Sequence, residues 1–168
     1  FVLGIAVQGN LLAFKLSELH FYCNTLQAIA VGYLIASVVF LNSGLTGQIT
    51  ATAALLTGYW ALMTFVPFPG HAAGTLEPNA NLALYFDETI LGRFRDGTPY
   101  TWILSSMGFG ATVLMGMLGG RVVASRRRGV MKSLGLLAAG TGCLVIAWAW
   151  SRWCPINKHV WTSSMALW

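Results

Sequence analysis

One short polar stretch, PINKHVWTSS at residues 155–164, stands between two apolar runs. Asn157 can cap a helix start, because its side chain accepts hydrogen bonds from unpaired backbone N–H groups. Lys158 can place positive charge beside a phosphate or a developing oxyanion. Trp161 can anchor the chain at the membrane interface or wall a cavity. These residue types therefore allow two interpretations: a capped helix with an aromatic belt, or the mouth of a polar cavity.

Other polar residues lie near the ends of apolar segments. Asn24 and Gln27 are about one helical turn apart and so share a helix face. Polar groups in membrane segments are costly, which makes them functional candidates; hydrogen bonding between helices is the structural alternative. Asp87 lies in the long connection 67–98. We expect one cavity to be lined by Asn24, Gln27, Asp87, Asn157, Lys158 and Trp161.

The remaining reactive residues form no recognised catalytic or metal-binding motif. None of the histidines has a Ser, Cys or Asp partner at motif spacing, so the catalytic residues stay unassigned. These histidines are His20, His71 and His159. The cysteines form neither a CxxC pair nor a Cys/His ligand set, and no metal is predicted. They are Cys23, Cys143 and Cys154.

The elements that must position these residues are membrane helices. Hydrophobic residues make up 56% of the 168 positions and charged residues only 9%, far below the roughly 25% of soluble domains. So few charges cannot cover a soluble surface, and the sequence predicts an integral protein of the lipid bilayer. The net charge of +5 does not indicate nucleic acid, because half of the basic residues lie between Arg121 and Lys132.

Segment lengths predict the architecture. A bilayer core about 30 Å thick needs about 20 apolar residues for each crossing. We therefore expect an all-α, polytopic transmembrane bundle in a single domain, 1–168, with four complete spans and two partial ones. The complete spans are 24–41, 48–66, 99–120 and 130–150, and the partial ones are 1–14 and 160–168. Because the chain starts and stops inside apolar runs, we interpret it as the interior of a larger polytopic protein.

The basic residues predict the orientation. The connection 121–132 carries five Lys/Arg residues and no acid, so it is expected on the cytoplasmic side. The connections then alternate, which places 67–98 outside. Within it, apolar residues between positions 82 and 90 recur at helical spacing, as in a short helix lying on the membrane surface.

A stripe of small residues follows one face of the predicted helix 99–120. Gly108, Thr112, Gly116 and Gly120 recur at every fourth position. Such stripes let helix backbones approach closely in lipid. We expect the whole face to be buried against protein, so that Gly116→Leu would disrupt folding.

Several segments resemble one enzyme family. PINKHVWTSS (155–164) is similar to the signature P-[IV]-N-K-x-[LV]-W-[TS]-x-S of the heparan-α-glucosaminide N-acetyltransferase family, and the bacterial acyltransferase-like branch resembles the chain best. NTLQAIAVGYLIAS (24–37) resembles the family's L-Q-[RAS]-I-A-x-x-Y-L helix. Residues 66–92 resemble its outer loop, with VPFPG for VPVPG and a Y-[IF]-D segment, and residues 100–120 resemble the helix that follows.

The resemblance implies a membrane enzyme that takes an acetyl or acyl group from cytoplasmic acyl-CoA, its cofactor. The acceptor would be an amino sugar or glycan on the periplasmic side of the bacterial inner membrane. The family's active-site histidine lies upstream of the matched segments, and none of the histidines here matches it. Two alternatives therefore stay open: a catalytically silent subunit of a larger membrane complex, and a transporter or channel. The expected partners are lipid and copies of this chain or other membrane subunits.

Overall fold

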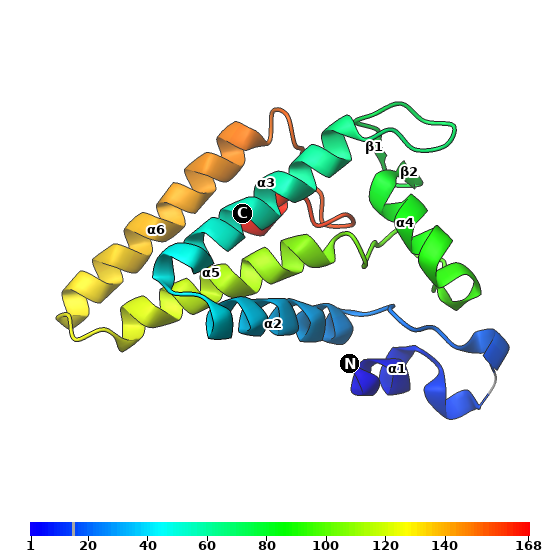
Figure 1. Ribbon diagram of the computed structural model, residues 1–168, viewed down its shortest axis with the longest axis horizontal. Coiled ribbons are helices and arrows are strands. Elements are labelled where there is room, and N and C mark those ends of the chain that lie inside the picture. The colour runs from blue at the N-terminus through cyan, green and yellow to red at the C-terminus, as the bar shows by residue number, and fades with distance from the viewer. Residues whose placement is uncertain (15) are drawn as a thin grey trace.

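Helices account for most of the chain, which the computed structural model describes over residues 1–14 and 16–168 (Figure 1). Among these residues, three helices are long and apolar enough to cross a membrane: α2 (Thr25–Asn42), α5 (Ser106–Ala124) and α6 (Gly129–Trp150). An α-helix satisfies its backbone hydrogen bonds internally, as a segment inside lipid must. The chain is therefore a helical protein of membrane-like character.

A fourth long helix, α3 (Leu45–Phe65), is not among these candidate spans. Its 21 residues are enough to cross a bilayer core. However, Gln48 and several threonines interrupt its apolar sequence. The described part of the chain thus contains three candidate spans, where the sequence predicted four complete ones.

The shorter elements surround these helices. They comprise α1 (Val2–Gln8), the 3-10 turns Leu11–Ala13 and Leu16–Glu18, the antiparallel strands β1 (Leu76–Glu77) and β2 (Ala80–Asn81), α4 (Leu82–Leu91), a 3-10 turn at Gly92–Phe94, and α7 (Ser163–Leu167). The short helix expected near residues 82–90 is α4. Asn81 caps it, because its side-chain oxygen accepts the N–H of Leu84 at 2.8 Å.

Two predicted helices have different bounds. The helix expected over 1–14 ends at Gln8, and Asn10 adopts a left-handed backbone (φ 58°) that cannot continue it. The helix expected from residue 99 begins only at Ser106. Residues 99–105 instead form an irregular segment that ends in a turn at 103–105, and the Asp87 carboxylate accepts the N–H groups of Trp102 and Ile103 in it.

The long helices run alternately in opposite directions, so their ends form two groups (Figure 1). The basic connection 125–128 and the α2–α3 turn lie at one end. The start of α2, the connection from α3 to α5 and the connection 151–162 lie at the other. Residues that are far apart in sequence are therefore gathered at this second end.

Glycines set the contact between α2 and α5. A Cβ atom on Gly32 would lie 3.0 Å from the carbonyl oxygen of Phe109, and one on Gly110 would lie 2.7 Å from Cγ2 of Ile35. Side chains at these two positions would push the helices apart. Close backbone approach through small residues is the usual way that helices pack in lipid.

The predicted small-residue stripe of α5 packs over only part of its length. A Cβ on Gly108 would meet Trp161, and the Thr112 hydroxyl accepts a hydrogen bond from the same residue. Gly116 and Gly120 are exposed, and no atom would lie within 4 Å of a Cβ there. The stripe prediction is therefore wrong for these two glycines within the described chain, because no element covers that part of α5.

Candidate functional site

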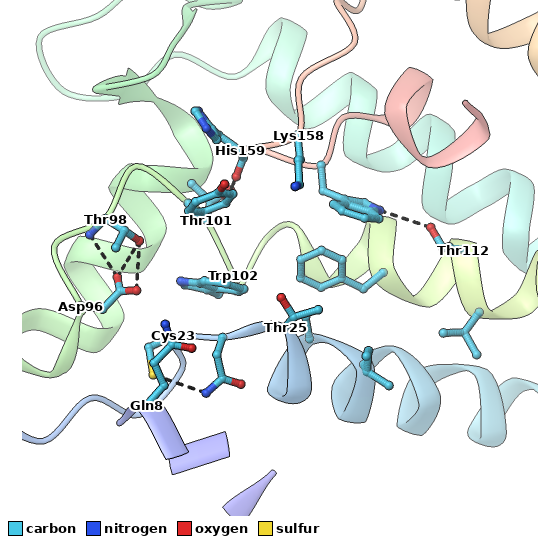
Figure 2. A pocket seen from close by; sticks show the side chains of 17 residues that line it. Gln8, Cys23, Thr25, Asp96, Thr98, Thr101, Trp102, Thr112, Lys158 and His159 are labelled. Atoms are coloured by element: carbon cyan, nitrogen blue, oxygen red, sulfur yellow. Dashed lines mark hydrogen bonds between the residues drawn. The ribbon is translucent and has the colours of Figure 1, made fainter. Parts of the chain in front are cut away.

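A cavity of about 380 Å³ lies at the end of the bundle where α2 and α5 begin (Figure 2). Its walls come from the last residue of α1, the start of α2, the connection 96–102, the first turns of α5 and the turn 158–161. Aromatic side chains form much of the lining: Tyr100, Trp102, Phe109 and Trp161. An apolar pocket with a few convergent polar groups is the usual form of a small-molecule site.

The turn that carries Lys158 is held by its own side chains. The Thr162 hydroxyl donates to the carbonyl of Pro155 at 2.8 Å and accepts the N–H of Asn157 at 3.1 Å. The Asn157 side chain accepts the N–H of His159 at 2.9 Å. Asn157 thus caps this turn and is not among the residues lining the cavity. Its predicted cavity-lining role is corrected to a local structural one.

The same turn is docked onto its neighbours through two backbone carbonyls. The carbonyl of His159 accepts the N–H of Thr101 at 3.0 Å. The carbonyl of Val160 accepts the hydroxyl of Ser105 at 2.9 Å and also that of Tyr59. Because all these groups are buried or partly buried, the bonds fix the turn against α3 and the start of α5.

Trp161 reaches the cavity from a left-handed backbone with φ 46°. Its indole Nε1 donates to the Thr112 hydroxyl at 3.3 Å, and its ring packs edge-on against Phe109 at 5.4 Å between centroids. The space that it occupies exists because Gly108 has no side chain: a Cβ there would lie 2.8 Å from the Trp161 carbonyl oxygen. Gly108 therefore belongs to the construction of the cavity wall.

Two charged side chains line the cavity from different sides. The ammonium group of Lys158 points into it, and Asp96 lies across from it (Figure 2). The Asp96 carboxylate accepts the hydroxyl of Thr98 at 3.0 Å and the N–H of the same residue at 3.2 Å. Among the described residues that line the cavity, Lys158 is thus the one Lys or Arg, and the Asp96 carboxylate is already engaged by Thr98.

The start of α2 forms the floor. Asn24 lines the cavity and caps α2, since its Oδ1 accepts the N–H of Gln27 at 3.1 Å while its Nδ2 donates to the Gly4 carbonyl at 2.7 Å. Gln27 is fully buried behind it. Its amide accepts the N–H of Cys23 at 2.9 Å and donates to the carbonyl of Phe21. Gln27 therefore fixes the first turn of α2. Contrary to the prediction, it does not line the cavity.

Asp87 also lies outside the cavity lining, contrary to expectation. Its side chain is completely buried, and it accepts the N–H groups of Trp102 at 2.7 Å and Ile103 at 2.9 Å. Burial raises the pKa of this carboxyl to about 6, against the opposing effect of these two bonds. Of the six residues predicted to line one cavity, Asn24, Lys158 and Trp161 do so.

Several lining residues were not predicted from the sequence. Cys23, Asp96, Thr101 and Trp102 are the chief polar or aromatic examples. The sequence segment that could have indicated this wall is YTW after Pro99, but it was predicted to be part of a membrane helix. His159 lines the cavity with its ring edge-on to Tyr100, at 4.7 Å between centroids.

The arrangement of these residues is that of a ligand-binding site, and we assign no nucleophile in it. Aromatic walls, hydroxyl groups and one ammonium group can hold a small polar ligand and stabilise negative charge on it. Among the described residues, no group of three or more His, Cys, Asp or Glu side chains is arranged to hold a metal ion. Comparisons of the chain with models of protein families, with curated proteins and with solved structures give no match.

Proposed function

We propose that this chain forms the acceptor end of a transmembrane acyltransferase, in which the cavity binds an amino sugar or glycan on the periplasmic side. The observation that carries the proposal is the meeting of Lys158 and Trp161, from the segment that resembles the family signature, with Asn24 of α2 in one cavity. Acyl-CoA would supply the acyl group from the cytoplasmic side: the new amide C–N bond replaces the thioester C–S bond, and CoA leaves as its thiol with the proton that the amine loses.

The size and lining of the cavity favour the acceptor over the whole donor. About 380 Å³ is near the lower end of small-molecule sites and suits a group the size of a monosaccharide. The aromatic rings can stack on the apolar faces of a sugar ring, while Gln8 and Thr25, two exposed residues of the lining, offer hydrogen bonds to its hydroxyl groups. Lys158 would stabilise the oxyanion that forms when an amine attacks an acyl group.

The proposed topology makes α3 a further span and puts 121–132 in the cytoplasm of a bacterial cell, with the cavity at the opposite end. The alternating direction of the long helices supports it, because the basic connection lies at the opposite end of the bundle from the starts of α2 and α5, which line the cavity (Figure 1). In a background with the three cysteines replaced by alanine, Arg127→Cys should resist an impermeant maleimide in intact cells. Ala73→Cys should react readily as the matched control, and rapid labelling at position 127 would reverse the orientation.

Acyl transfer itself is tested with the full-length protein in membrane vesicles, supplied with labelled acetyl-CoA and with glucosamine as the probe acceptor. We expect labelled N-acetylglucosamine to form. Glucosamine should also slow the modification of Cys23, because this thiol lines the cavity and is only 3% exposed. Protection without transfer would favour the catalytically silent alternative. If glucosamine neither protects Cys23 nor becomes acetylated, the proposed acceptor site is wrong.

A further inference from the structure

Asp87 is a buried carboxylate that the proposed acyl transfer does not use. It lies on α4, within the segment that joins α3 to α5, and its side chain is 0% exposed. Both carboxylate oxygens are engaged by backbone: Oδ2 accepts the N–H of Trp102 at 2.7 Å and Oδ1 accepts that of Ile103 at 2.9 Å. A buried charge of this kind is costly unless it is well bonded, so its place in the fold calls for a reason.

The backbone that Asp87 binds is a wall of the cavity. Trp102 lines the cavity, and so does Thr101, the residue before it (Figure 2). The carbonyl of His159 holds the N–H of Thr101 from the opposite side, at 3.0 Å. The Trp102 ring stacks on Tyr22 at 5.6 Å between centroids, next to Cys23 in the floor. Hydrogen bonds thus hold this wall on two sides, from α4 and from the turn that carries Lys158.

We propose that Asp87 is a positioning residue that couples the outer segment to the cavity, by fixing the Trp102–Ile103 backbone so that Thr101 and Trp102 form its wall. This inference depends on the proposed function in one respect: it takes this cavity as the ligand site. Loss of the carboxylate would leave two buried N–H groups without an acceptor, which favours opening of the wall.

The proposal gives the wall a pH dependence with a defined sign. Burial raises the pKa of Asp87 to about 6 in the closed wall, and contact with water on opening would lower it towards about 4. Protonation therefore favours the closed wall, and opening increases as the pH rises through about 6. The charged or titratable groups that act on Asp87 are Arg95, Asp96, Tyr22 and Tyr59.

Reaction of Cys23 with a neutral maleimide measures opening of the wall without any substrate. The full-length protein carries Cys143→Ala and Cys154→Ala, so that only Cys23 among the three cysteines reacts. With Asp87→Ala, labelling at pH 7.5 should be roughly tenfold faster than in the parent. A matched protein keeps only Cys154, which is buried but outside the cavity. In it, Asp87→Ala should leave the rate of Cys154 labelling unchanged. Glu77→Gln, an exposed acid in the same outer segment, should change neither rate.

Asp87→Asn separates positioning from general destabilisation. This variant is neutral at every pH, so the ratio of parent to variant labelling at Cys23 should rise between pH 5 and pH 7.5, while the thiol's own ionisation cancels. Labelling of Cys23 at the parent rate at pH 7.5 in Asp87→Asn, whose amide nitrogen cannot accept an N–H, would overturn the proposal even if Asp87→Ala fails to fold. A constant ratio would contradict the pH dependence alone. Equal acceleration at Cys23 and Cys154 would also overturn it, since that pattern reports global loosening. Both labelling measurements, at Cys23 and at Cys154, need no substrate, so they test this proposal even if no acyl transfer is detected.

Discussion

Replacing Gly108 with leucine is expected to destabilise the protein strongly and to destroy the cavity. A Cβ at this position would lie 2.8 Å from the carbonyl oxygen of Trp161 and 2.9 Å from its Cδ1 atom. The Trp161 backbone cannot retreat easily, because the carbonyl of Val160 and the N–H of Thr162 on either side are hydrogen-bonded. Overpacking of this kind costs about 1–3 kcal/mol or more, which lowers the melting temperature by several degrees in a chain of this size.

The matched control is Gly116→Leu, two turns further along the same helix. No atom would lie within 4 Å of its Cβ, so the melting temperature of the purified protein in detergent should hardly change. This expectation reverses the one drawn from the sequence, in which Gly116 was part of a buried face. Equal losses in the two variants would show that α5 packs uniformly along the stripe and would contradict the assignment of Gly108 to the cavity wall.

Removing the charge of Lys158 is expected to reduce acyl transfer by roughly 100-fold, the usual cost of losing one group that stabilises a developing oxyanion. Lys158→Met keeps an unbranched side chain of nearly the same length while deleting the ammonium group. Lys158→Arg keeps the charge but alters its shape and should lose about tenfold. The measurement is the rate of labelled acetyl transfer to glucosamine by full-length protein in vesicles, normalised to the amount of folded protein.

Lys132→Met provides the comparison, because Lys132 lies in the first turn of α6, directly after the basic connection 125–128, where its ammonium donates to the carbonyl of Val123. That variant should transfer acetyl groups at the parent rate. If Lys158→Met did the same, Lys158 would be only an interfacial cation of the kind that anchors membrane helices. The proposed role in charge stabilisation would then be wrong.

Properties that depend on composition and local pattern were predictable from the sequence. The scarcity of charges indicated a membrane-like helical chain, and the expected helix 130–150 matches α6 closely. The helix of the outer connection also follows from a local signal, namely apolar residues at helical spacing. Each of these signals is contained within a few residues of chain.

The cavity depended on tertiary structure. Gly108 and Gly116 are the same residue type in one stripe, yet only Gly108 meets a neighbour, and that neighbour is a tryptophan from a distant turn. Asn157 and Lys158 are adjacent, but the first is used within its own turn while the second points into the cavity. Asp87 binds the N–H groups of Trp102 and Ile103, and the helix expected from residue 99 begins only at Ser106. Periodicity cannot report such choices, because hydrogen bonds and close contacts between distant segments decide them.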